Sequence, residues 1–362
     1  MTSSAVSSAN FRIATIAVAL LVGFMAGRWL TTWPDLAAAN LSNVIRRDPT
    51  PLDVDFFRLQ DIYGPLRFAM FQQEPATCNP FVMAFGREGK RITVNDNIWD
   101  TALTEPGFHW KYPIEEGFAF EVIMESCVKD ENGLTPLVLD AGANMGWFSL
   151  SAAACGCEAI AFEPNPVCQE FIGGSAVLNN FGSAVHRRTV AVTDVQQPIS
   201  FNGWATATDE NKLREQPAGN FVDGVRLDDE FQAFSATHYV LYLKVDIQGS
   251  EHDAIRGASK LLSSRKVRFV AFEAQLRAAE GSTEDAFKQL CLHGYQCFDV
   301  EKPLEMISCS ESLSVYRDSR ADCKSGDTKC ERYIMCAHEK SHEEMLRKRI
   351  NAMQMEAREL RI

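Results

Sequence analysis

Short apolar runs alternate with helix-like stretches through most of this 362-residue chain, and the alternation strongly constrains its fold. Runs such as Ala159-Ile160-Ala161-Phe162 are apolar at every position, which is typical of strands covered on both faces. The runs expected to form strands are 137–139, 159–162, 185–192, 239–245, 267–272, 295–300 and 313–316. The stretches expected to form helices are 147–154, 166–179, 250–262 and 282–294. Repeated β-α units predict an α/β fold, with a parallel sheet between two layers of helices.

A glycine-containing turn follows the first of these strands. Asp140 ends the strand, Gly142 and Gly146 lie in the turn, and a helix is expected from Trp147. Glycine lets a backbone approach a ligand closely, and free N–H groups at a helix start favour an anionic group. That group would be the carboxylate of S-adenosylmethionine or the pyrophosphate of a dinucleotide. Dinucleotide folds carry GxGxxG, whereas 141–146 has two glycines, so the spacing favours S-adenosylmethionine.

Two further buried runs also end in an acid. Glu163 follows the second run, where a carboxylate can accept hydrogen bonds from both ribose hydroxyls; the alternative is an ordinary strand-end charge. Asp246 follows the fourth run and would orient substrate, act as a general base or bind a metal. Lys244 alternates with Asp246, so both are expected on one side of the sheet. An internal salt bridge between them is the alternative.

Three sequence blocks together resemble the FkbM family of methyltransferases. They are DAGANMGWFSL at 140–150, AFEPNP at 161–166 and LKVDIQGSEHDAIRGA at 243–258. The resemblance covers about residues 115–300 and implies a class I, Rossmann-like methyltransferase fold, whose seven-stranded and mostly parallel sheet has one reversed strand. It also implies methyl transfer from S-adenosylmethionine, commonly to a hydroxyl oxygen. The cofactor-binding residues that it implies are Asp140, Gly142, Asn144 and Gly146 in the loop, Glu163 at the ribose and Asp194 near the adenine.

The third block departs from the family at Gln248, where the family usually has glutamate. The catalytic candidates are therefore Asp246, Glu251 and Lys244. A hydroxyl acceptor needs a base or a metal near the transferred methyl group. A magnesium site on Asp246 and Glu273 is a less favoured alternative, so no metal ligand is assigned.

The N-terminal segment 11–30 predicts a single-pass membrane anchor. Residues 13–27 carry no charge, arginines flank them, and Trp29 and Trp33 follow where an interfacial aromatic belt would lie. With its flanks, the segment reaches the roughly 20 residues that a span needs. A cleaved signal peptide is the alternative. The expected organisation is a short tail at 1–10, the anchor at 11–30, a proline-rich stem and lead-in at 31–112, a methyltransferase domain at 113–316 and a cysteine-containing helical tail at 317–362.

Eleven cysteines are many for a reducing compartment, and Asn40-Leu41-Ser42 is a glycosylation sequon just past the apolar segment. With the anchor, they favour the secretory pathway (endoplasmic reticulum or Golgi) and a lumenal catalytic domain, although the flanking arginines leave the orientation open. Cysteines near the C-terminus, such as Cys336, are expected to form disulfides or to remain unpaired thiols, with a zinc site as the less favoured alternative. Cys155 and Cys157 are expected to pack in the core.

The net charge of −12 and the lack of a basic stripe argue against a nucleic-acid partner. The expected partners are S-adenosylmethionine and a hydroxyl-bearing glycan, lipid or secondary metabolite. Two alternatives stay open. One is a catalytically inactive methyltransferase fold that serves as an interaction module at a membrane. The other is an NAD-dependent oxidoreductase, against which the missing glycine counts.

Overall fold

The computed structural model describes residues 66–71, 78–79, 81–86, 123, 126–201, 220–275, 282–299, 306–307, 331–338 and 344. The chain divides into two compact units, and the described residues all belong to the one formed by Asp53–Thr93 and Lys111–Ile362. The expected anchor at 11–30, the tail at 1–10 and the strand at 313–316 lie outside the described residues. None of the helices in the described ranges is both long and apolar enough to cross a membrane.

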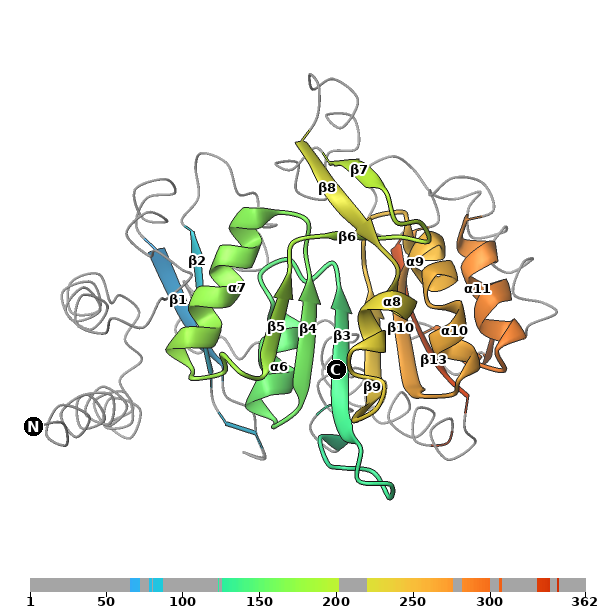
Figure 1. The fold of residues 1–362 in the computed structure, drawn as a ribbon, viewed down its shortest axis with the longest axis horizontal. Helices are drawn as coiled ribbons and strands as arrows, with labels where there is room; N and C mark the ends of the chain where they lie inside the picture. The colour runs from blue at the N-terminus through green and yellow to red at the C-terminus, as the bar shows by residue number, and fades with distance from the viewer. Residues whose placement is uncertain are drawn as a thin grey trace, which may run out of the picture. The chain divides into compact units, whose positions relative to one another are not determined.

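An eight-stranded sheet forms the centre of the described unit (Figure 1). In their order across the sheet, the strands are β12 (Met306–Ile307), β11 (Gln296–Asp299), β13 (Glu331–Ala337), β10 (Val267–Gln275), β9 (His238–Val245), β3 (Thr135–Ala141), β4 (Glu158–Phe162) and β5 (Val185–Arg188). The strands from β10 to β5 are parallel, and β13 runs antiparallel between β10 and β11. This arrangement confirms the expected mostly parallel sheet, and the reversed strand β13 lies in its interior. The two-residue β12, antiparallel to β11, adds an edge strand to the expected seven.

The reversed strand comes from a part of the chain expected to be a separate helical tail. β13 pairs with both β10 and β11, and its residues from Tyr333 to Ala337 are buried. The apolar run Tyr-Ile-Met-Cys-Ala is compatible with a strand, but charged residues surround it, and the run was therefore assigned to the helical tail. The sheet therefore extends beyond residue 316, the expected domain boundary.

Helices cover both faces of the sheet. They are α6 (Trp147–Ala154), α7 (Pro166–Leu178), α8 (Leu227–Gln232), α9 (Glu251–Gly257), α10 (Ser259–Ser263) and α11 (Ser282–Leu292). On one face, the Phe148 ring of α6 stacks on Tyr242 of β9 with centroids 6.4 Å apart. On the other, Leu243 of β9 shares a core cluster with Ile255 of α9 and Phe287 of α11. Successive strand residues point to opposite faces, so these contacts place α6 opposite α9 and α11.

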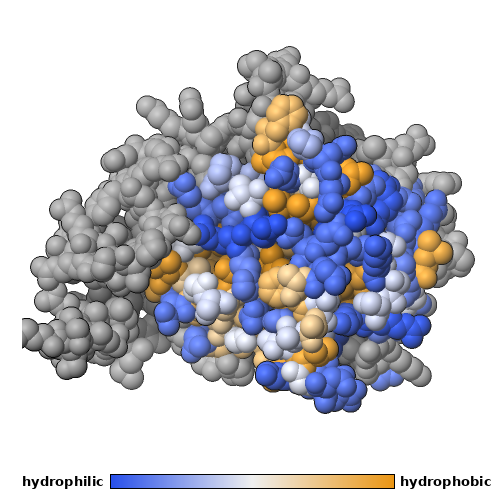
Figure 2. Space-filling view, in the orientation of Figure 1, coloured by the Kyte–Doolittle hydropathy of each residue, from blue (hydrophilic) through white to orange (hydrophobic). Residues whose placement is uncertain are grey.

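Two smaller sheets accompany the central one. β1 (Leu66–Phe71) pairs with β2 (Phe81–Gly86), while β6 (Ala191–Val192) and β7 (Pro198–Phe201) pair with β8 (Asn220–Val225). The single strand expected at 185–192 is thus divided between β5 and β6, which belong to different sheets. The described surface in Figure 2 is mostly hydrophilic, with hydrophobic surface over β8.

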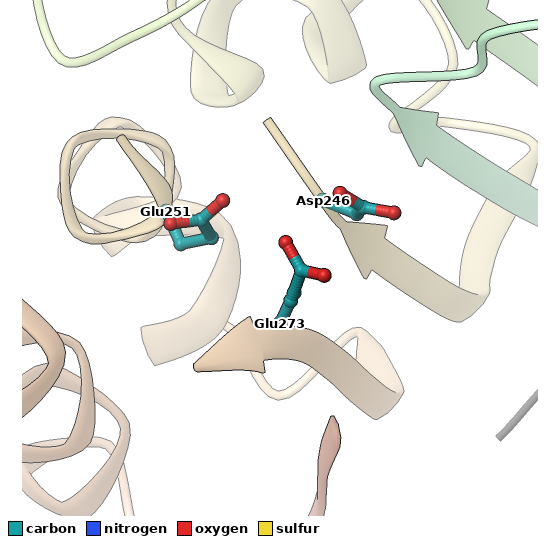
Figure 3. A group of neighbouring side chains, drawn as sticks. All are labelled: Asp246, Glu251 and Glu273. Atoms are coloured by element: carbon teal, nitrogen blue, oxygen red, sulfur yellow. The ribbon is translucent and has the colours of Figure 1, made fainter. Parts of the chain in front are cut away.

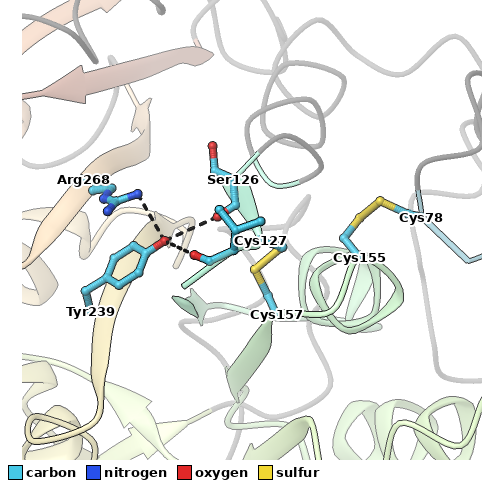
Figure 4. Close-up of a disulfide and its surroundings, with 8 residues drawn as sticks. Cys78, Ser126, Cys127, Cys155, Cys157, Tyr239 and Arg268 are labelled. Carbon is cyan, nitrogen blue, oxygen red and sulfur yellow. Dashed lines mark hydrogen bonds between the residues drawn. A yellow bond between two sulfur atoms is a disulfide. The ribbon is translucent and has the colours of Figure 1, made fainter. Parts of the chain in front are cut away.

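Disulfides join early segments of the chain to the end of α6 (Figure 4). Cys155 is bonded to Cys78, and Cys157 is bonded to Cys127. The expectation that Cys155 and Cys157 only fill the core was wrong, because their partners are distant in sequence and no local pattern reveals them. Beside Cys127, the Tyr239 hydroxyl donates a 3.0 Å hydrogen bond to the carbonyl of Val128.

A third disulfide joins Cys297 of β11 to Cys336 of β13, inside the core. Cys336 therefore belongs to a disulfide, as expected, and its sulfur is not available to the alternative zinc site. Cys291 is also disulfide-bonded, whereas Cys168 is a buried free thiol.

Candidate active site

The turn after β3 lies directly against the end of β9. Gly142 has a φ of 78°, and the N–H groups of Gly142 and Ala143 both donate to the carbonyl of Phe162 at the end of β4. A Cβ at Gly142 would lie 1.8 Å from the main-chain oxygen of Asp246. Glycine is therefore required here by a contact within the chain. The sequence had suggested contact with a ligand instead.

Gly146 is required for a similar reason. It precedes α6 with a φ of 86°, and a Cβ there would lie 2.8 Å from Cγ1 of Ile172 in α7. Both glycines thus allow close packing between elements, and the N-terminus of α6 at Trp147 is where the sequence predicted it.

Asp140 lies beneath the turn and is fully buried. Its Oδ2 accepts hydrogen bonds from the main-chain N–H of Ser149 at 3.1 Å and from the Ser149 hydroxyl at 2.7 Å. Burial raises the pKa of Asp140, and this effect outweighs the opposing effects of Lys244 and Ser149. Within the described ranges, Oδ1 accepts no hydrogen bond, but the Lys244 ammonium lies 3.6 Å away. Asp140 therefore binds the first turn of α6, which follows the glycine-containing turn.

Lys244 connects the turn to Asp246. Its Nζ donates a 2.6 Å hydrogen bond to the carbonyl of Gly142 and lies 3.6 Å from Oδ2 of Asp246. Burial acts to lower the pKa of Lys244, but the nearby carboxylates, led by Asp246 and Asp140, raise it overall. Its side chain is 3% exposed. Such a buried, charged ammonium is suited to holding the site together, which is the salt-bridge alternative expected from the sequence.

Glu163 ends β4 beside the same turn. Its Oε2 accepts a 2.9 Å hydrogen bond from the N–H of Asn144, and its Oε1 accepts a 2.9 Å bond from the N–H of Asn165. Burial raises the pKa of Glu163, against the lowering effect of these two bonds. Because each carboxylate oxygen has two lone pairs, both oxygens can accept a further hydrogen bond from a ligand. Asn144 is exposed at the tip of the turn, with a φ of 48°.

Asp246, Glu251 and Glu273 form an acidic group at the carboxyl ends of β9 and β10 (Figure 3). Each offers an oxygen within 4.8 Å of the others. The side-chain amide of Gln248 donates to Oδ1 of Asp246 at 2.9 Å and to Oε2 of Glu273 at 3.3 Å. Asp246 is half-buried, so part of this residue is accessible to solvent.

Glu251 plays a different part from Asp246. It is buried, and its Oε1 accepts 3.0 Å hydrogen bonds from the N–H groups of Ile247 and Gly249. Burial raises the pKa of Glu251 to about 7, although hydrogen bonds from the loop act against the rise. These bonds fix the loop between β9 and α9, which makes Glu251 a loop-stabilising residue.

Asp194 lies just beyond β6, and its polar contacts differ from those of the other predicted residues. Its Oδ2 accepts a 3.0 Å hydrogen bond from Nε of Arg256 in α9, and its Oδ1 lies 3.4 Å from the hydroxyl of Thr193. The backbone here touches α9 closely, since a Cβ at Gly257 would lie 2.2 Å from the carbonyl oxygen of Thr193. The structure thus links Asp140, Glu163, Lys244 and Asp246 to the turn, and it links Asp194 to α9.

Residues 140–297 match the family model of the methyltransferase FkbM domain. This chain contains an FkbM methyltransferase domain. The matched segment includes all nine predicted site residues, but it ends before β13, which completes the sheet.

The chain is similar at low sequence identity to one curated methyltransferase and to solved methyltransferase structures. Methyltransferase sdnD from Sordaria araneosa is 26% identical over 182 residues, which are 41% of this chain and 70% of that protein. The solved METTL16 MTase domain is 9% identical with a TM-score of 0.29, and the match covers 61% of this chain and 64% of that one. The T. thermophilus 16S rRNA N2 G1207 methyltransferase, solved with AdoMet and guanosine, is 11% identical with a TM-score of 0.35. That match covers 76% of this chain and 51% of that one.

Sequence reasoning missed several residues that position the site of the FkbM domain. Ser149 binds Asp140, and Arg256 binds Asp194. The buried Gln169 of α7 donates hydrogen bonds to the carbonyls of Ala161 and Arg188, which joins the ends of β4 and β5. The sequence carries no strong signal for these contacts, because each joins elements that only the fold brings together. A glutamine on the buried face of a predicted helix was the one available hint.

Proposed function

We propose that this chain transfers the methyl group of S-adenosylmethionine to a hydroxyl group of an acceptor. The supporting observation is that Asp140, Glu163 and Asp246 end three adjacent parallel strands, β3, β4 and β9, within an FkbM methyltransferase domain. Ligands of open α/β sheets bind at this edge, beyond the carboxyl ends of the strands. Among the described residues at this edge, the acidic side chains outnumber the basic one, Lys244, and an excess of negative charge favours a sulfonium cation.

The cofactor would lie against the turn at 142–146. Glu163 is 8% exposed and retains lone pairs for the two ribose hydroxyls, while Asn144 at the tip of the turn offers an exposed amide. Glu163 holds the turn through the N–H of Asn144, and Asp140 holds the start of α6 through Ser149, so a ligand would meet a preformed surface. Asp194 remains a candidate for the adenine end through its position after β6.

The acceptor hydroxyl would be deprotonated by Asp246. S-adenosylmethionine supplies an electrophilic methyl group. As the acceptor oxygen forms its bond to that carbon, the carbon–sulfur bond breaks, the electron pair stays on sulfur, and the proton passes to the Asp246 carboxylate. Alignment and proton removal are the main demands of this reaction. The buried ammonium of Lys244, 3.6 Å from Oδ2, would hold the carboxylate in place.

The acceptor is proposed to lie in the secretory pathway. Three disulfides within the described ranges support an oxidising compartment, since such bonds rarely persist in a reducing cytosol. With the apolar segment at 11–30, they favour a lumenal domain held at a membrane, and hence a glycan, lipid or secondary-metabolite hydroxyl as the acceptor. Protease protection of the chain in sealed microsomes tests this orientation.

Ligand binding tests the cofactor directly. S-adenosylhomocysteine should raise the melting temperature of the purified chain, and NAD should not. Glu163→Gln should weaken S-adenosylhomocysteine binding by about 10- to 100-fold, because it removes charge-assisted hydrogen bonds to the ribose. Isothermal titration measures the affinity, and Glu131→Gln at an exposed position is the control.

Stabilisation by NAD alone would instead favour an oxidoreductase. Binding of S-adenosylhomocysteine without transfer of a labelled methyl group to any glycan, lipid or metabolite offered would favour the inactive interaction module. Equal affinities for the wild type and Glu163→Gln would contradict the ribose assignment.

A further inference from the structure

The loop after β9 contains an amide group between two carboxylates. Gln248 directs its Nε2 toward Oδ1 of Asp246 at 2.9 Å and toward Oε2 of Glu273 at 3.3 Å. A primary amide has two N–H donors, so one nitrogen can serve both carboxylates at once. The two acids come from neighbouring strands, and their oxygens lie within 4.8 Å of each other.

Two carboxylates at this separation repel each other unless a donor or a cation lies between them. A divalent cation usually bridges such oxygens in proteins. Here the donor is a neutral side chain of the same loop, which satisfies one oxygen of each acid. The remaining oxygen of Asp246 faces the Lys244 ammonium at 3.6 Å. The Asp246 carboxylate is therefore held from two sides by groups of the chain.

The backbone at Gln248 supports a specific role for this residue. Its φ is 60°, in the left-handed region that glycine, asparagine and aspartate adopt most easily. The next residue, Gly249, has a φ of 106°. The neighbouring loop N–H groups are fixed by the buried Glu251, which holds the turn in this conformation. Strained residues of this kind persist where the surrounding structure determines them, and they cluster at functional sites.

We propose that Gln248 is a positioning residue that takes the place of a bridging cation between Asp246 and Glu273. Its amide orients the Asp246 carboxylate toward the acceptor without a metal. This role rests on the proposed function for its catalytic consequence, but the bridge between the two acids can be tested separately.

Gln248→Glu tests the hydrogen-bond donors of the amide without changing the shape of the side chain. The substitution keeps the side-chain size and replaces the two N–H donors with a carboxylate, which joins the acidic group of Asp246, Glu251 and Glu273. Free Mn²⁺ should bind the wild type weakly and the variant at least roughly tenfold more tightly, because added carboxylates raise the affinity for hard divalent cations. Isothermal titration with MnCl₂ measures this. Gln289→Glu on α11 is the matched control and should bind no more tightly than the wild type.

Adding Glu273→Gln to Gln248→Glu should abolish the gained affinity. Tight Mn²⁺ binding by the wild type that Glu273→Gln abolishes would overturn the proposal, since the acids would then hold a cation despite the amide. An unchanged Mn²⁺ affinity in Gln248→Glu would overturn it as well.

Gln248→Gly tests the catalytic consequence, because glycine accepts the positive φ and removes the side chain that carries the amide. The variant should lower kcat for labelled methyl transfer by about 10-fold and leave the affinity for S-adenosylhomocysteine unchanged. An unchanged kcat would contradict the positioning role. Failure of the wild type to bind S-adenosylhomocysteine would count against the proposed function. The Mn²⁺ titrations would still test whether the Gln248 amide bridges Asp246 and Glu273.

Discussion

At the scale of single residues, the acids of the site have different environments. Asp246 is half-buried and faces donors on two sides, whereas Glu251 is buried and, among the described residues, accepts hydrogen bonds from its own loop. Both were catalytic candidates because Gln248 stands where the family usually has glutamate. Asp246 is the proposed base and Glu251 stabilises the loop because the two residues differ in burial. The sequence pattern at the end of a strand does not predict this difference.

The raised pKa of Glu251 predicts a pH dependence of stability. Its ordinary pKa of 4.5 in the unfolded chain rises to about 7 in the folded one, so the folded state holds more protons between these values. The stabilisation is fully present below pH 4.5 and is lost as the pH rises through 7. Urea unfolding should show a loss of about 3 kcal/mol across this window that Glu251→Gln lacks.

Glu131→Gln serves as the control for this pH series, since Glu131 is exposed and should leave the wild-type slope intact. If Glu251→Gln lost stability with pH as steeply as the wild type, burial of the Glu251 carboxyl could not be the cause.

At the scale of elements, the strand tips are packed against one another through main-chain atoms. The turn after β3 touches the end of β9 at Gly142, and the end of β4 binds the same turn through the Phe162 carbonyl. The geometry of the site therefore depends on the packing of β3, β4 and β9 against one another.

Two glycines with nearly the same φ allow this contact to be measured. Gly142→Ala and Gly133→Ala both incur the strain of a positive φ, at 78° and 77°, but only the first places a Cβ 1.8 Å from a main-chain oxygen. Gly142→Ala should therefore lower the free energy of unfolding by at least about 2 kcal/mol more than Gly133→Ala, as read from urea titrations. Equal losses in the two variants would show that the turn tolerates a side chain.

The elements near the turn were the most predictable from the sequence. The runs at β3, β4, β9 and β10 and the start of α6 follow directly from apolar runs and the glycine turn. Because parallel strands end at one edge, the convergence of Asp140, Glu163 and Asp246 was predictable too. β13 was not, since its position between β10 and β11 depends on pairing across a long separation. The reason that position 142 requires glycine was not predictable either, because the atom that a Cβ would meet is the main-chain oxygen of Asp246, which is distant in sequence.

At the scale of the whole molecule, disulfides tie distant segments to the FkbM domain. The Cys127–Cys157 bond spans a sequence separation of 30 residues, and a bond of this kind stabilises by restricting the unfolded chain. A variant with both Cys127→Ala and Cys157→Ala should lose about 2–5 kcal/mol of unfolding free energy, measured by thermal or urea unfolding without reductant.

Dithiothreitol should likewise lower the melting temperature of the wild type. Cys168→Ala removes a free thiol and no bond, so its melting temperature should fall with reductant as far as that of the wild type. Insensitivity of the wild type to reductant would contradict the disulfides and weaken the case for an oxidising compartment.

The interior position of β13 also bears on how the chain completes its fold during synthesis. In the described sheet β13 lies between β10 and β11, so a nascent chain that ends before Glu331 leaves the β10 edge open and β11 paired with β12 alone. The segment between Asp299 and Glu331 must therefore be synthesised before the sheet can close. The disulfide between Cys297 and Cys336 can form only after Cys336 has been synthesised, so this bond is made late in the synthesis of the domain.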